Sequence, residues 1–346
     1  MGFAHRKKPD VRIWTFVKLG LTTLILPAGE AAVAQAARCL ADGGLVAFPT
    51  ETVYGLGADA TDPVAVARLY EAKGRPAFNP LIAHVASLEA ARGVGRLDPQ
   101  AIALAWAFWP GPLTLVVPRT RHCAVAELAT AGLDTIAIRV PAHPIAGAIL
   151  HAFGKPVVAP SANLSGHVSP TTAAHVASDL EGRIDLIVDG GPVEVGVEST
   201  IVGCFEHPML LRPGGVPRAA IERVLGRRLA QPPVDAETAT AQPLAPGMLA
   251  SHYAPHTGVR LNATEVEPGE ALLAFGPAAI TGVDGASAVM NLSAAGDLGQ
   301  AAANLFGHLR VLDTKAARAI AVMPIPNEGL GEAINDRLRR AAVGRE

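Results

Sequence analysis

Short apolar runs alternate with helix-like patterns along most of this chain. Glu30 to Ala41 is rich in alanine and stops at Asp42-Gly43-Gly44, which predicts a helix closed by a glycine. Asp62-Pro63 predicts another helix start, because an N-cap residue is followed by proline at the first helical position. Further helices are expected at about 98–108, 143–152, 171–180 and 217–225.

Short continuous apolar runs predict buried strands between these helices. The expected strands are 45–48, 81–85, 113–117, 135–140, 157–159, 186–189, 200–202 and 209–211. Strands that are apolar throughout and separated by helices are typical of an α/β domain whose sheet is covered on both faces. The segment from Pro49 to Gly57, directly after one such strand, is interpreted as a polar loop.

The alternation breaks at residues 226–247. This stretch contains Arg227-Arg228 and Pro232-Pro233 without apolar periodicity, which is typical of a linker. Strands at 259–261, 271–275 and 288–291 and helices near 295–310 and 329–343 then predict a small second α/β domain. We expect an N-terminal extension at 1–23, a main domain at 24–226, a linker or lid at 227–256 and the small domain at 257–346.

Composition narrows the classes of function. Half of the 346 residues are hydrophobic and 17% are charged, which describes a folded globular protein rather than a disordered one. The net charge is −2 and no dense basic stripe is present, so tight direct binding of nucleic acid is not expected. Cys39, Cys123 and Cys204 lie far apart and outside any Cys-x-x-Cys pair. Neither a disulfide framework nor a zinc site is therefore expected, and a cytoplasmic location fits best.

The first residues resemble a signal peptide only loosely. A basic start precedes an apolar stretch from Val11 to Leu26, but Arg12 and Lys18 interrupt it. The longest uncharged run, Leu19 to Gly29, is too short to span a bilayer. We interpret the segment as an extension that leads into the first strand and expect no membrane association; export remains the alternative.

Candidate chemistry lies in loops that combine cations with proline and glycine. The chain has neither a Gly-x4-Gly-Lys-Ser/Thr loop nor a Gly-x-Gly-x-x-Gly motif after a strand. Instead, three segments place an arginine one or two residues before a proline: Lys73-Gly74-Arg75-Pro76, Arg139-Val140-Pro141 and Arg212-Pro213-Gly214-Gly215. Several such cations at strand ends would suit a polyphosphate, with arginine giving bidentate contacts. The alternative for each is an ordinary surface ion pair.

Three polar segments supplement these cations. Ala159 to Gly166 follows a strand with serine and asparagine side chains that suit an anion, or simply a capped turn. Pro49 to Gly57 and Gly196 to Thr200 each place hydroxyls and a carboxylate at a strand end. His84 is a lone histidine on an apolar strand, for which the ordinary interpretation is a hydrogen-bonded core residue.

Taken together, the motifs resemble one family specifically. KGRPAFNPLIAH, WPGPLTLVV, DTIAIRVPAHPIA, APSANLSGHVSPT, VDGG, GVESTI and LLRPGG follow in the order found in the YrdC-like threonylcarbamoyl-AMP synthases and cover residues 24–226 almost without interruption. APGMLASHYAP, from Ala245 to Pro255, resembles the linker of the long two-domain form. The resemblance implies a twisted mixed sheet with flanking helices, followed by a linker and a small Rossmann-like α/β domain.

The resemblance also implies the site residues. The positions that match threonine contacts are Thr52, His84, Arg139, Ala159 and Ser199. The positions that match the surroundings of ATP are Lys73, Arg75, Asn79, Thr135, Ser161, Ser169, Arg212 and Tyr253, with Lys73 and Arg75 as the expected catalytic cations. His84 thereby changes from an expected core residue to an expected ligand contact.

The implied reaction joins L-threonine, bicarbonate and ATP. The resulting carbamate attacks the α-phosphorus and expels pyrophosphate, with Mg²⁺ carried mainly by ATP rather than by a protein metal site. A downstream transferase would then use the product to modify tRNA. Two alternatives stay open: a carbamoyl-adenylate-forming domain like that of hydrogenase maturation proteins, and an RNA-binding module without catalysis. The missing Cys-x-x-Cys motifs argue against the first, and the 4% aromatic content argues against the second.

Overall fold

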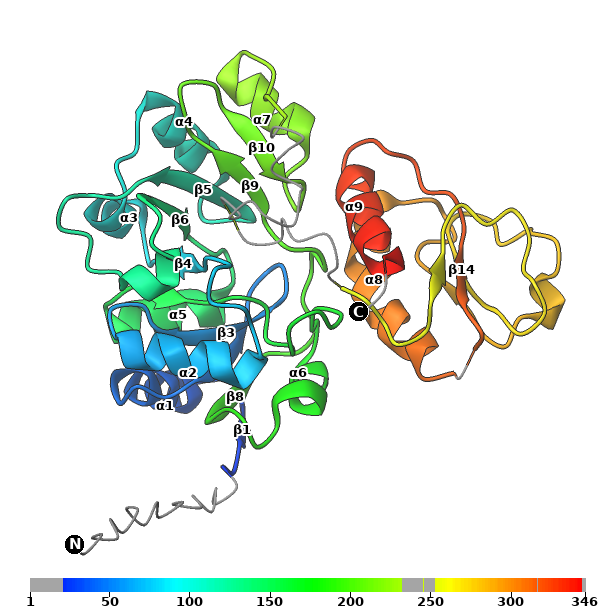
Figure 1. Ribbon diagram of the computed structural model, residues 1–346, viewed down its shortest axis with the longest axis horizontal. Helices are drawn as coiled ribbons and strands as arrows, with labels where there is room; N and C mark the ends of the chain where they lie inside the picture. Colours follow the sequence, from blue (N-terminus) through cyan, green and yellow to red (C-terminus); the bar gives the residue numbers. More distant parts are fainter. Residues whose placement is uncertain (1–20, 232–244, 246–252, 316, 344–346) are drawn as a thin grey trace, which may run out of the picture.

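The computed structural model describes residues 21–231, 245, 253–315 and 317–343, which form two α/β units (Figure 1). The described strands of the larger unit are β1 (Leu24–Pro27), β2 (Val46–Pro49), β3 (Tyr54–Asp59), β4 (Ile82–His84), β5 (Leu113–Pro118), β6 (Thr135–Arg139), β7 (Val157–Val158), β8 (Leu186–Asp189), β9 (Thr200–Gly203) and β10 (Met209–Arg212). Its described helices are α1 (Glu30–Ala41), α2 (Pro63–Lys73), α3 (Leu88–Val94), α4 (Pro99–Phe108), α5 (Pro144–Phe153), α6 (Ala173–Leu180) and α7 (Arg218–Leu225), with a 3₁₀ turn η1 (Glu127–Thr130).

The larger sheet is mixed, with strand order β1-β8-β2-β3-β7-β4-β6-β5-β9-β10. The sheet contains parallel pairs, such as β4 with β6 and β5 with β9, and antiparallel pairs, such as β2 with β3 and β9 with β10. Neighbouring strands twist relative to each other, so a sheet of this width curves strongly. The expected twisted mixed sheet is confirmed.

Helices cover both faces of this sheet, as the apolar strands predict. Helices α2, α3, α4, α6 and α7 contribute to one large core, and α1 and α5 pack against a second core that includes Phe48 and Val157. Asp62 caps α2 by accepting a hydrogen bond from the Val64 amide, so the N-cap prediction is confirmed. Among the three cysteines, Cys204 is buried, whereas Cys39 and Cys123 are only half-buried and all three are free.

The interpretation of residues 49–57 as a loop is wrong for its second half. Strand β3 begins at Tyr54 and pairs with β2, so Pro49 lies opposite Tyr54 in a hairpin. Glycine normally weakens a strand, which is why this segment reads as a loop from the sequence. Here a Cβ at Gly57 would lie only 2.7 Å from Phe48 Cε1, so the glycine is required by close packing.

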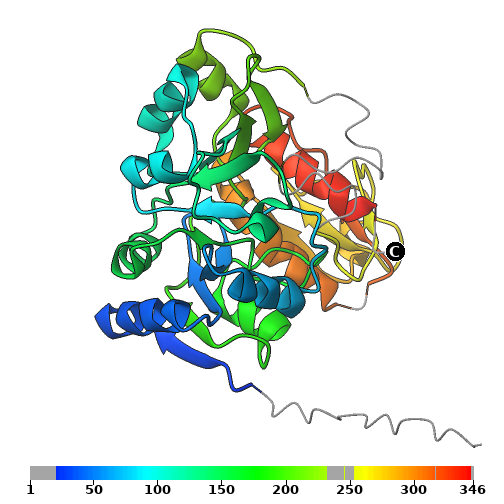
Figure 2. The same ribbon diagram turned by 60° about the vertical axis from the view of Figure 1, so that its left-hand side comes forward.

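The smaller unit is a parallel sheet with helices toward the larger unit. Its described strands are β11 (Val259–Arg260), β12 (Ala271–Ala274), β13 (Val289–Asn291) and β14 (Ile320–Val322), in the order β11-β14-β12-β13. Helices α8 (Leu298–Asp313) and α9 (Gly331–Ala342) lie on the side of the sheet that faces the larger unit (Figures 1 and 2). Strand β14 was not predicted from the sequence, but the second α/β domain is confirmed.

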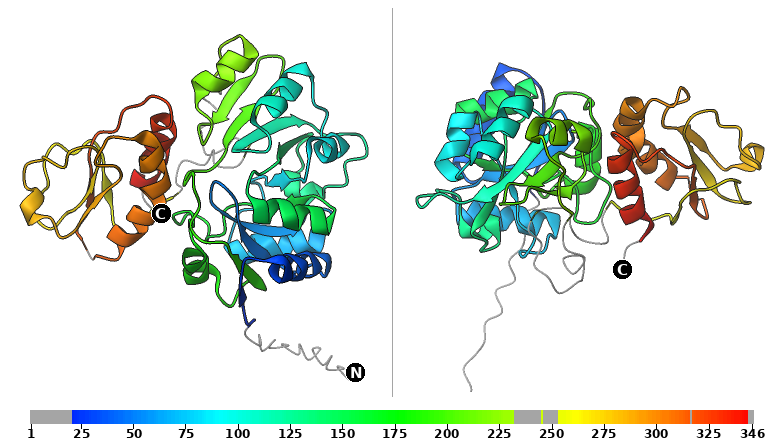
Figure 3. Two further views of the ribbon diagram at one scale, coloured as in Figure 1. Left: turned by 180° about the vertical axis from the view of Figure 1, so that it is seen from behind. Right: turned by 90° about the horizontal axis from the view of Figure 1, so that it is seen from above.

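The two units share one apolar core. Val53, Val168 and Val197 of the larger unit belong to the same buried cluster as Leu305 and Phe306 of α8. The view from above in Figure 3 shows α8 and α9 between the two sheets. Burial of apolar side chains on both sides of a boundary disfavours its opening, so the second unit is packed against the first rather than tethered beside it.

Candidate active site

Two neighbouring strands provide the centre of the site. Strands β4 and β6 are parallel, and their register places His84 opposite Arg139. Side chains alternate along a strand, so both residues lie on the same face as their partners two positions earlier, Ile82 and Ala137. His84 and Arg139 are 2% and 4% exposed. An apolar-looking strand and its neighbour therefore present two polar side chains side by side.

Two hydrogen bonds fix the guanidinium of Arg139 but engage only part of its donors. Its Nη2 donates to Glu51 Oε1 at 2.7 Å, and its Nε donates to the Gly111 carbonyl at 3.3 Å. The second Glu51 oxygen accepts from the Ala142 amide at 3.1 Å, which fixes the carboxylate in turn. A guanidinium has five N–H donors, so these two bonds leave three for a ligand. The geometry suits bidentate binding of a carboxylate.

His84 is a neutral acceptor in this site. Its Nδ1 lies 3.1 Å from the Ile82 carbonyl, and because a carbonyl can only accept, Nδ1 carries the proton and Nε2 does not. Burial, and secondly the charge of Arg139, lower the pKa of His84 to about 3. His84 can therefore accept a hydrogen bond from a hydroxyl or amine of a bound ligand at neutral pH.

The buried state of His84 predicts a specific acid sensitivity of folding. The pKa is about 3 in the folded chain against the ordinary 6.5, so between these values the unfolded chain binds a proton that the folded chain does not. The free energy of unfolding should then fall as pH drops from 6.5, by about 1.4 kcal/mol per pH unit for one proton. We expect His84→Gln to take up about one proton fewer on unfolding, so its free energy of unfolding should depend less on pH. Urea unfolding at about pH 7 and about pH 5 measures this. An equal change in the free energy of unfolding between the two pH values in both proteins would contradict this prediction.

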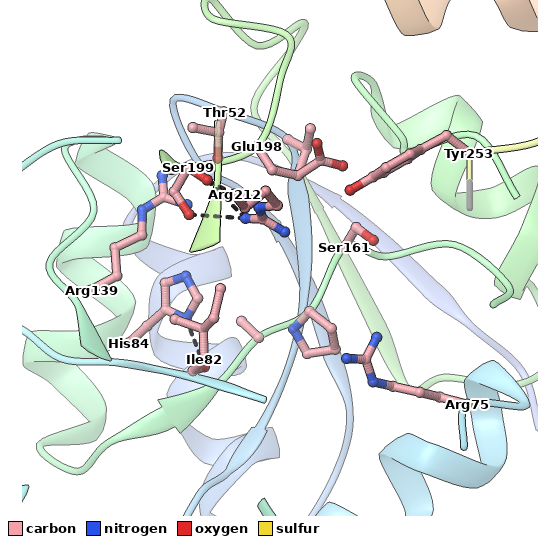
Figure 4. A pocket seen from close by; sticks show the side chains of 13 residues that line it. Thr52, Arg75, Ile82, His84, Arg139, Ser161, Glu198, Ser199, Arg212 and Tyr253 are labelled. Atoms are coloured by element: carbon pink, nitrogen blue, oxygen red, sulfur yellow. Dashed lines mark hydrogen bonds between the residues drawn. The ribbon is translucent and has the colours of Figure 1, made fainter. Parts of the chain in front are cut away.

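These residues line a cavity at the ends of the central strands (Figure 4). Its lining residues are Thr52, Val53, Arg75, Ile82, His84, Arg139, Ala159, Pro160, Ser161, Glu198, Ser199, Arg212 and Tyr253. All five positions predicted to contact threonine are included, together with Arg75, Ser161, Arg212 and Tyr253 of the ATP set. In Figure 4, His84, Arg139, Thr52 and Ser199 lie toward one end of the cavity, whereas Arg75, Ser161 and Tyr253 lie toward the other.

Four predicted residues are not among those lining the cavity. Lys73 is fully buried at the end of α2, and its ammonium donates to the carbonyls of Ser161 and Asn163, each at 2.5 Å. Burial, with the charge of Arg75, lowers the pKa of Lys73 well below its usual value. In the described structure Lys73 therefore holds the serine-rich loop that follows β7. Its location corrects the expectation that Lys73 sits in a loop: it ends α2 and is buried.

The other three, Asn79, Ser169 and Thr135, also lie outside the cavity lining. Asn79 is buried and its Oδ1 has no hydrogen-bond partner, which leaves an acceptor available next to the loop of Arg75. Ser169 is buried and donates to Glu198 Oε1 at 2.5 Å. Thr135 begins β6, four residues before Arg139, and pairs with Pro118. Four residues of strand span roughly 13 Å, so Thr135 lies far from the threonine end.

Arg212 reaches the cavity from the edge strand β10. Its Nε and Nη2 both donate to the Ser199 carbonyl, at 3.2 and 2.9 Å. The register shifts between Leu210 and Arg212, and such an irregularity re-aims a side chain. The following Gly214 packs directly on this segment, since a Cβ there would lie 2.4 Å from the Ser199 carbonyl carbon. The glycines of this loop thus bring Arg212 against Ser199.

Two carboxylates in the site were missed as site residues. Glu51, which fixes Arg139, and Glu198, which lines the cavity, both belong to polar segments recognised in the sequence. Burial alone would favour the protonated acid, but the charges of Arg337 and Arg212 and the Ser169 hydroxyl hold the pKa of Glu198 at about 2. The sequence signal that could have identified these two carboxylates is that a buried cation needs an anionic partner. No sequence signal identified Arg337.

Tyr253 closes the cavity from the end of the linker. It is 1% exposed, its ring stacks on Phe306 at 5.5 Å between centroids, and it lines the same cavity as Arg75. The next residue, Ala254, donates its amide to the Gly166 carbonyl at 2.9 Å. Of the expected linker or lid at 227–256, residues 232–244 and 246–252 lie outside the described residues. The described residues Tyr253 and Ala254 therefore contact both units, through Phe306 and Gly166.

Within the described residues, no three or more His, Cys, Asp or Glu side chains are grouped so that they could hold a metal ion. Likewise, none of the helices in the described ranges has the length and apolar character needed to cross a bilayer.

Comparison with known families covers nearly the whole chain. The family described as "Telomere recombination", comprising Sua5, YciO and YrdC proteins, matches residues 38–214, and the family described as "Threonylcarbamoyl-AMP synthase, C-terminal domain" matches residues 216–343. The chain is similar to the threonylcarbamoyl-AMP synthase of Bacillus subtilis, with 41% identity over 92% of this chain and 95% of that one. For the protein of that name from Pyrococcus abyssi the values are 44%, 89% and 93%.

Solved structures agree with these matches. Sua5 of P. abyssi, crystallised with L-threonine, superposes with a TM-score of 0.84 at 39% identity and covers 93% of this chain and 97% of its own. YciO of E. coli superposes with a TM-score of 0.51 at 25% identity and covers 56% of this chain and 96% of its own. The two-domain relative therefore matches both units, whereas the one-domain relative matches about half of the chain.

Proposed function

This chain belongs to the Sua5/YrdC family of threonylcarbamoyl-AMP synthases, and on that premise we propose that its cavity converts L-threonine, bicarbonate and ATP into threonylcarbamoyl-AMP and pyrophosphate. It is an ATP-using nucleotidyltransferase whose product serves the threonylcarbamoyladenosine modification of tRNA. The observation that carries the proposal is one cavity that combines a carboxylate-binding Arg139 at one end with Arg75 and Arg212 for phosphates. Neither alternative function requires that pairing.

We assign the threonine end to Thr52, His84, Arg139, Ala159 and Ser199. The support is chemical: the free donors of Arg139 suit the α-carboxylate, and the neutral His84 Nε2 can accept from a hydroxyl or amine. Both side chains are held in place before any ligand arrives, by Glu51 and by the Ile82 carbonyl. Preorganised groups of this kind lower the cost of binding and of orienting the reactants.

The reaction itself needs no side-chain nucleophile. The threonine amine and bicarbonate lose water to form a carbamate, whose oxygen attacks the α-phosphorus and displaces pyrophosphate. We propose that Arg75 and Arg212 neutralise phosphate charge, and that Lys73 acts with them through the loop of Ser161. Asn79, Thr135, Ser161, Ser169 and Tyr253 complete the surroundings of ATP in this proposal. Mg²⁺ enters as part of the MgATP substrate.

We also propose the cytoplasm as the location and a tRNA threonylcarbamoyl transferase as the protein that consumes the product. A mixed anhydride of carbamate and phosphate is labile in water, so its consumer must act soon after release. The three free cysteines are consistent with a reducing compartment.

A threonine-dependence assay tests the proposal. The purified protein with MgATP and bicarbonate should release pyrophosphate only when L-threonine is present, and the adenylate should appear by mass spectrometry. A carbamoyl-adenylate-forming enzyme would respond to carbamoyl phosphate instead, and a binding module would release nothing. Pyrophosphate release that is indifferent to threonine would overturn the proposal.

Tyr253 is expected to contribute to ATP binding through its ring. We expect Tyr253→Ala to raise the KM for ATP by about tenfold, because loss of a buried aromatic side chain removes contact area and opens the cavity. Tyr253→Phe keeps the stack on Phe306 and should stay within about threefold of the parent. Steady-state kinetics with saturating threonine decides, and equal KM values for all three proteins would remove Tyr253 from the site.

A further inference from the structure

We propose that Arg337, from helix α9 of the second unit, is a positioning residue for the synthase reaction: it neutralises Glu198 and thereby keeps Arg212 available for ATP. The inference rests on the proposed function and assigns the second unit a role in it. Arg337 is not among the residues lining the cavity, so it acts through Glu198 and Tyr253 rather than on the substrates.

The contacts of Arg337 define a link from one unit to the other. Its side chain is fully buried, and its Nε donates to Glu198 Oε2 at 2.8 Å. Its guanidinium carbon also lies 5.2 Å from the centroid of the Tyr253 ring, a cation–π distance. On its own helix, Nη1 donates to Asp336 at 2.5 Å. One side chain of the second unit thus touches two residues of the cavity wall.

Charge explains why this link is needed. Glu198 is a buried anion on the wall of a cavity that must accept a triphosphate, and an unpaired anion there would repel it. It would also compete with phosphate for Arg212, whose hydrogen bonds within the described part of the chain all go to Ser199. With Arg337 on one oxygen and Ser169 on the other, both oxygens of Glu198 are engaged away from Arg212.

The docking of the second unit keeps Arg337 in place. Gly196, two residues before Glu198 in the same loop, packs on α8 so closely that a Cβ would lie 2.4 Å from the Ala302 carbonyl oxygen. Arg310 of α8 donates to Asp179 of α6 at 3.1 Å, which is a further contact between the two units. The loop that carries Glu198 is therefore held by the second unit through backbone packing as well as through charge.

Kinetics of four variants tests the inference. Arg337→Gln should raise the KM for ATP by at least about tenfold, as expected when a charge-assisted contact is lost, while threonine affinity by calorimetry changes less than about threefold. In the Glu198→Gln background the same substitution should change the KM for ATP by less than about threefold, because the anion is gone. Arg337→Lys retains the charge and should stay close to the parent.

A matched control separates this effect from loosened docking. Arg218 of α7 pairs with Glu332 of α9, with Nε 3.1 Å from Oε1, and neither residue lines the cavity. Arg218→Gln should leave the KM for ATP within about threefold of the parent. Four results would each overturn the inference: an unchanged KM for ATP in Arg337→Gln, a rise in Arg218→Gln equal to that in Arg337→Gln, an equal rise when Arg337→Gln is made in the Glu198→Gln background, or an equal rise in Arg337→Lys. If Arg337→Gln does not fold, the lysine variant and the double variant decide. Threonine-dependent synthesis by the unmodified protein separately decides the proposed function.

Discussion

Replacing Arg75 by alanine is expected to raise the KM for ATP at least about tenfold, while threonine affinity stays nearly unchanged. A charge-assisted hydrogen bond contributes about 1.5–3 kcal/mol, which corresponds to roughly one to two powers of ten in affinity. The guanidinium is pre-positioned for this contact: Nε donates to the Asn79 carbonyl at 3.3 Å and Nη2 to the Pro80 carbonyl at 3.0 Å. Initial rates of pyrophosphate release over a range of MgATP concentrations measure the effect.

The control for Arg75 lies on the preceding helix. Arg68 of α2 donates to the Gly43 carbonyl and pairs with Asp185 at 3.2 Å, and it does not line the cavity. Arg68→Ala removes the same number of atoms and the same charge, so its KM for ATP should remain within about twofold of the parent. If both variants lose ATP affinity equally, the general field of positive charge matters and Arg75 has no specific contact.

Arg139→Lys is expected to weaken threonine binding by about tenfold or more and ATP binding by less than about threefold. Lysine preserves the charge opposite Glu51, so the buried pair survives, but it cannot reproduce the planar fork that grips a carboxylate at two points. Calorimetric titration of threonine and of ATP into the same preparation measures both affinities. Equal losses for the two ligands would reassign Arg139 to the phosphates or to the framework.

A second arginine provides the reference for this substitution. Arg119 follows β5 and donates its Nη2 to the Val125 carbonyl at 3.1 Å, away from the cavity lining. Arg119→Lys should leave both affinities within about twofold of the parent, because the side-chain hydrogen-bond partners of Arg119, the Val125 carbonyl and the Thr130 hydroxyl, lie outside the cavity lining. A threonine defect in this variant would mean that the assay reports on general stability.

The local sequence was sufficient to predict those elements whose conformation depends on residues within the same short segment. The helix from Glu30 to Ala41 and the Asp62 cap of α2 follow from composition and capping, and the structure has both where they were expected. The apolar run that becomes β8, Leu186 to Asp189, also has the expected bounds. The polar face of β4 was visible only as a lone histidine, and its role could be predicted only through the family motifs.

Long-range contacts decided what the local pattern could not. Strand β3 was missed because Gly55 and Gly57 favour a loop locally, while Phe48 and Ala159 leave no room there for larger side chains. Lys73 was expected in a loop, because the neighbouring glycine and proline are turn residues. Only the docking of the Ser161 loop over the end of α2 encloses it.

The sequence by itself determined most of the order of elements, the two α/β units and, through its motifs, the family and most of the residues that line the cavity. Those properties follow from local periodicity and from short segments whose chemistry is readable in place. Only the tertiary structure decided which carboxylate serves which arginine, because Glu51 and Arg139 are 88 residues apart and Glu198 and Arg337 are 139 residues apart. A buried charge is stable only beside its partner, and the identity of that partner depends on how the sheet curves and how the second unit docks.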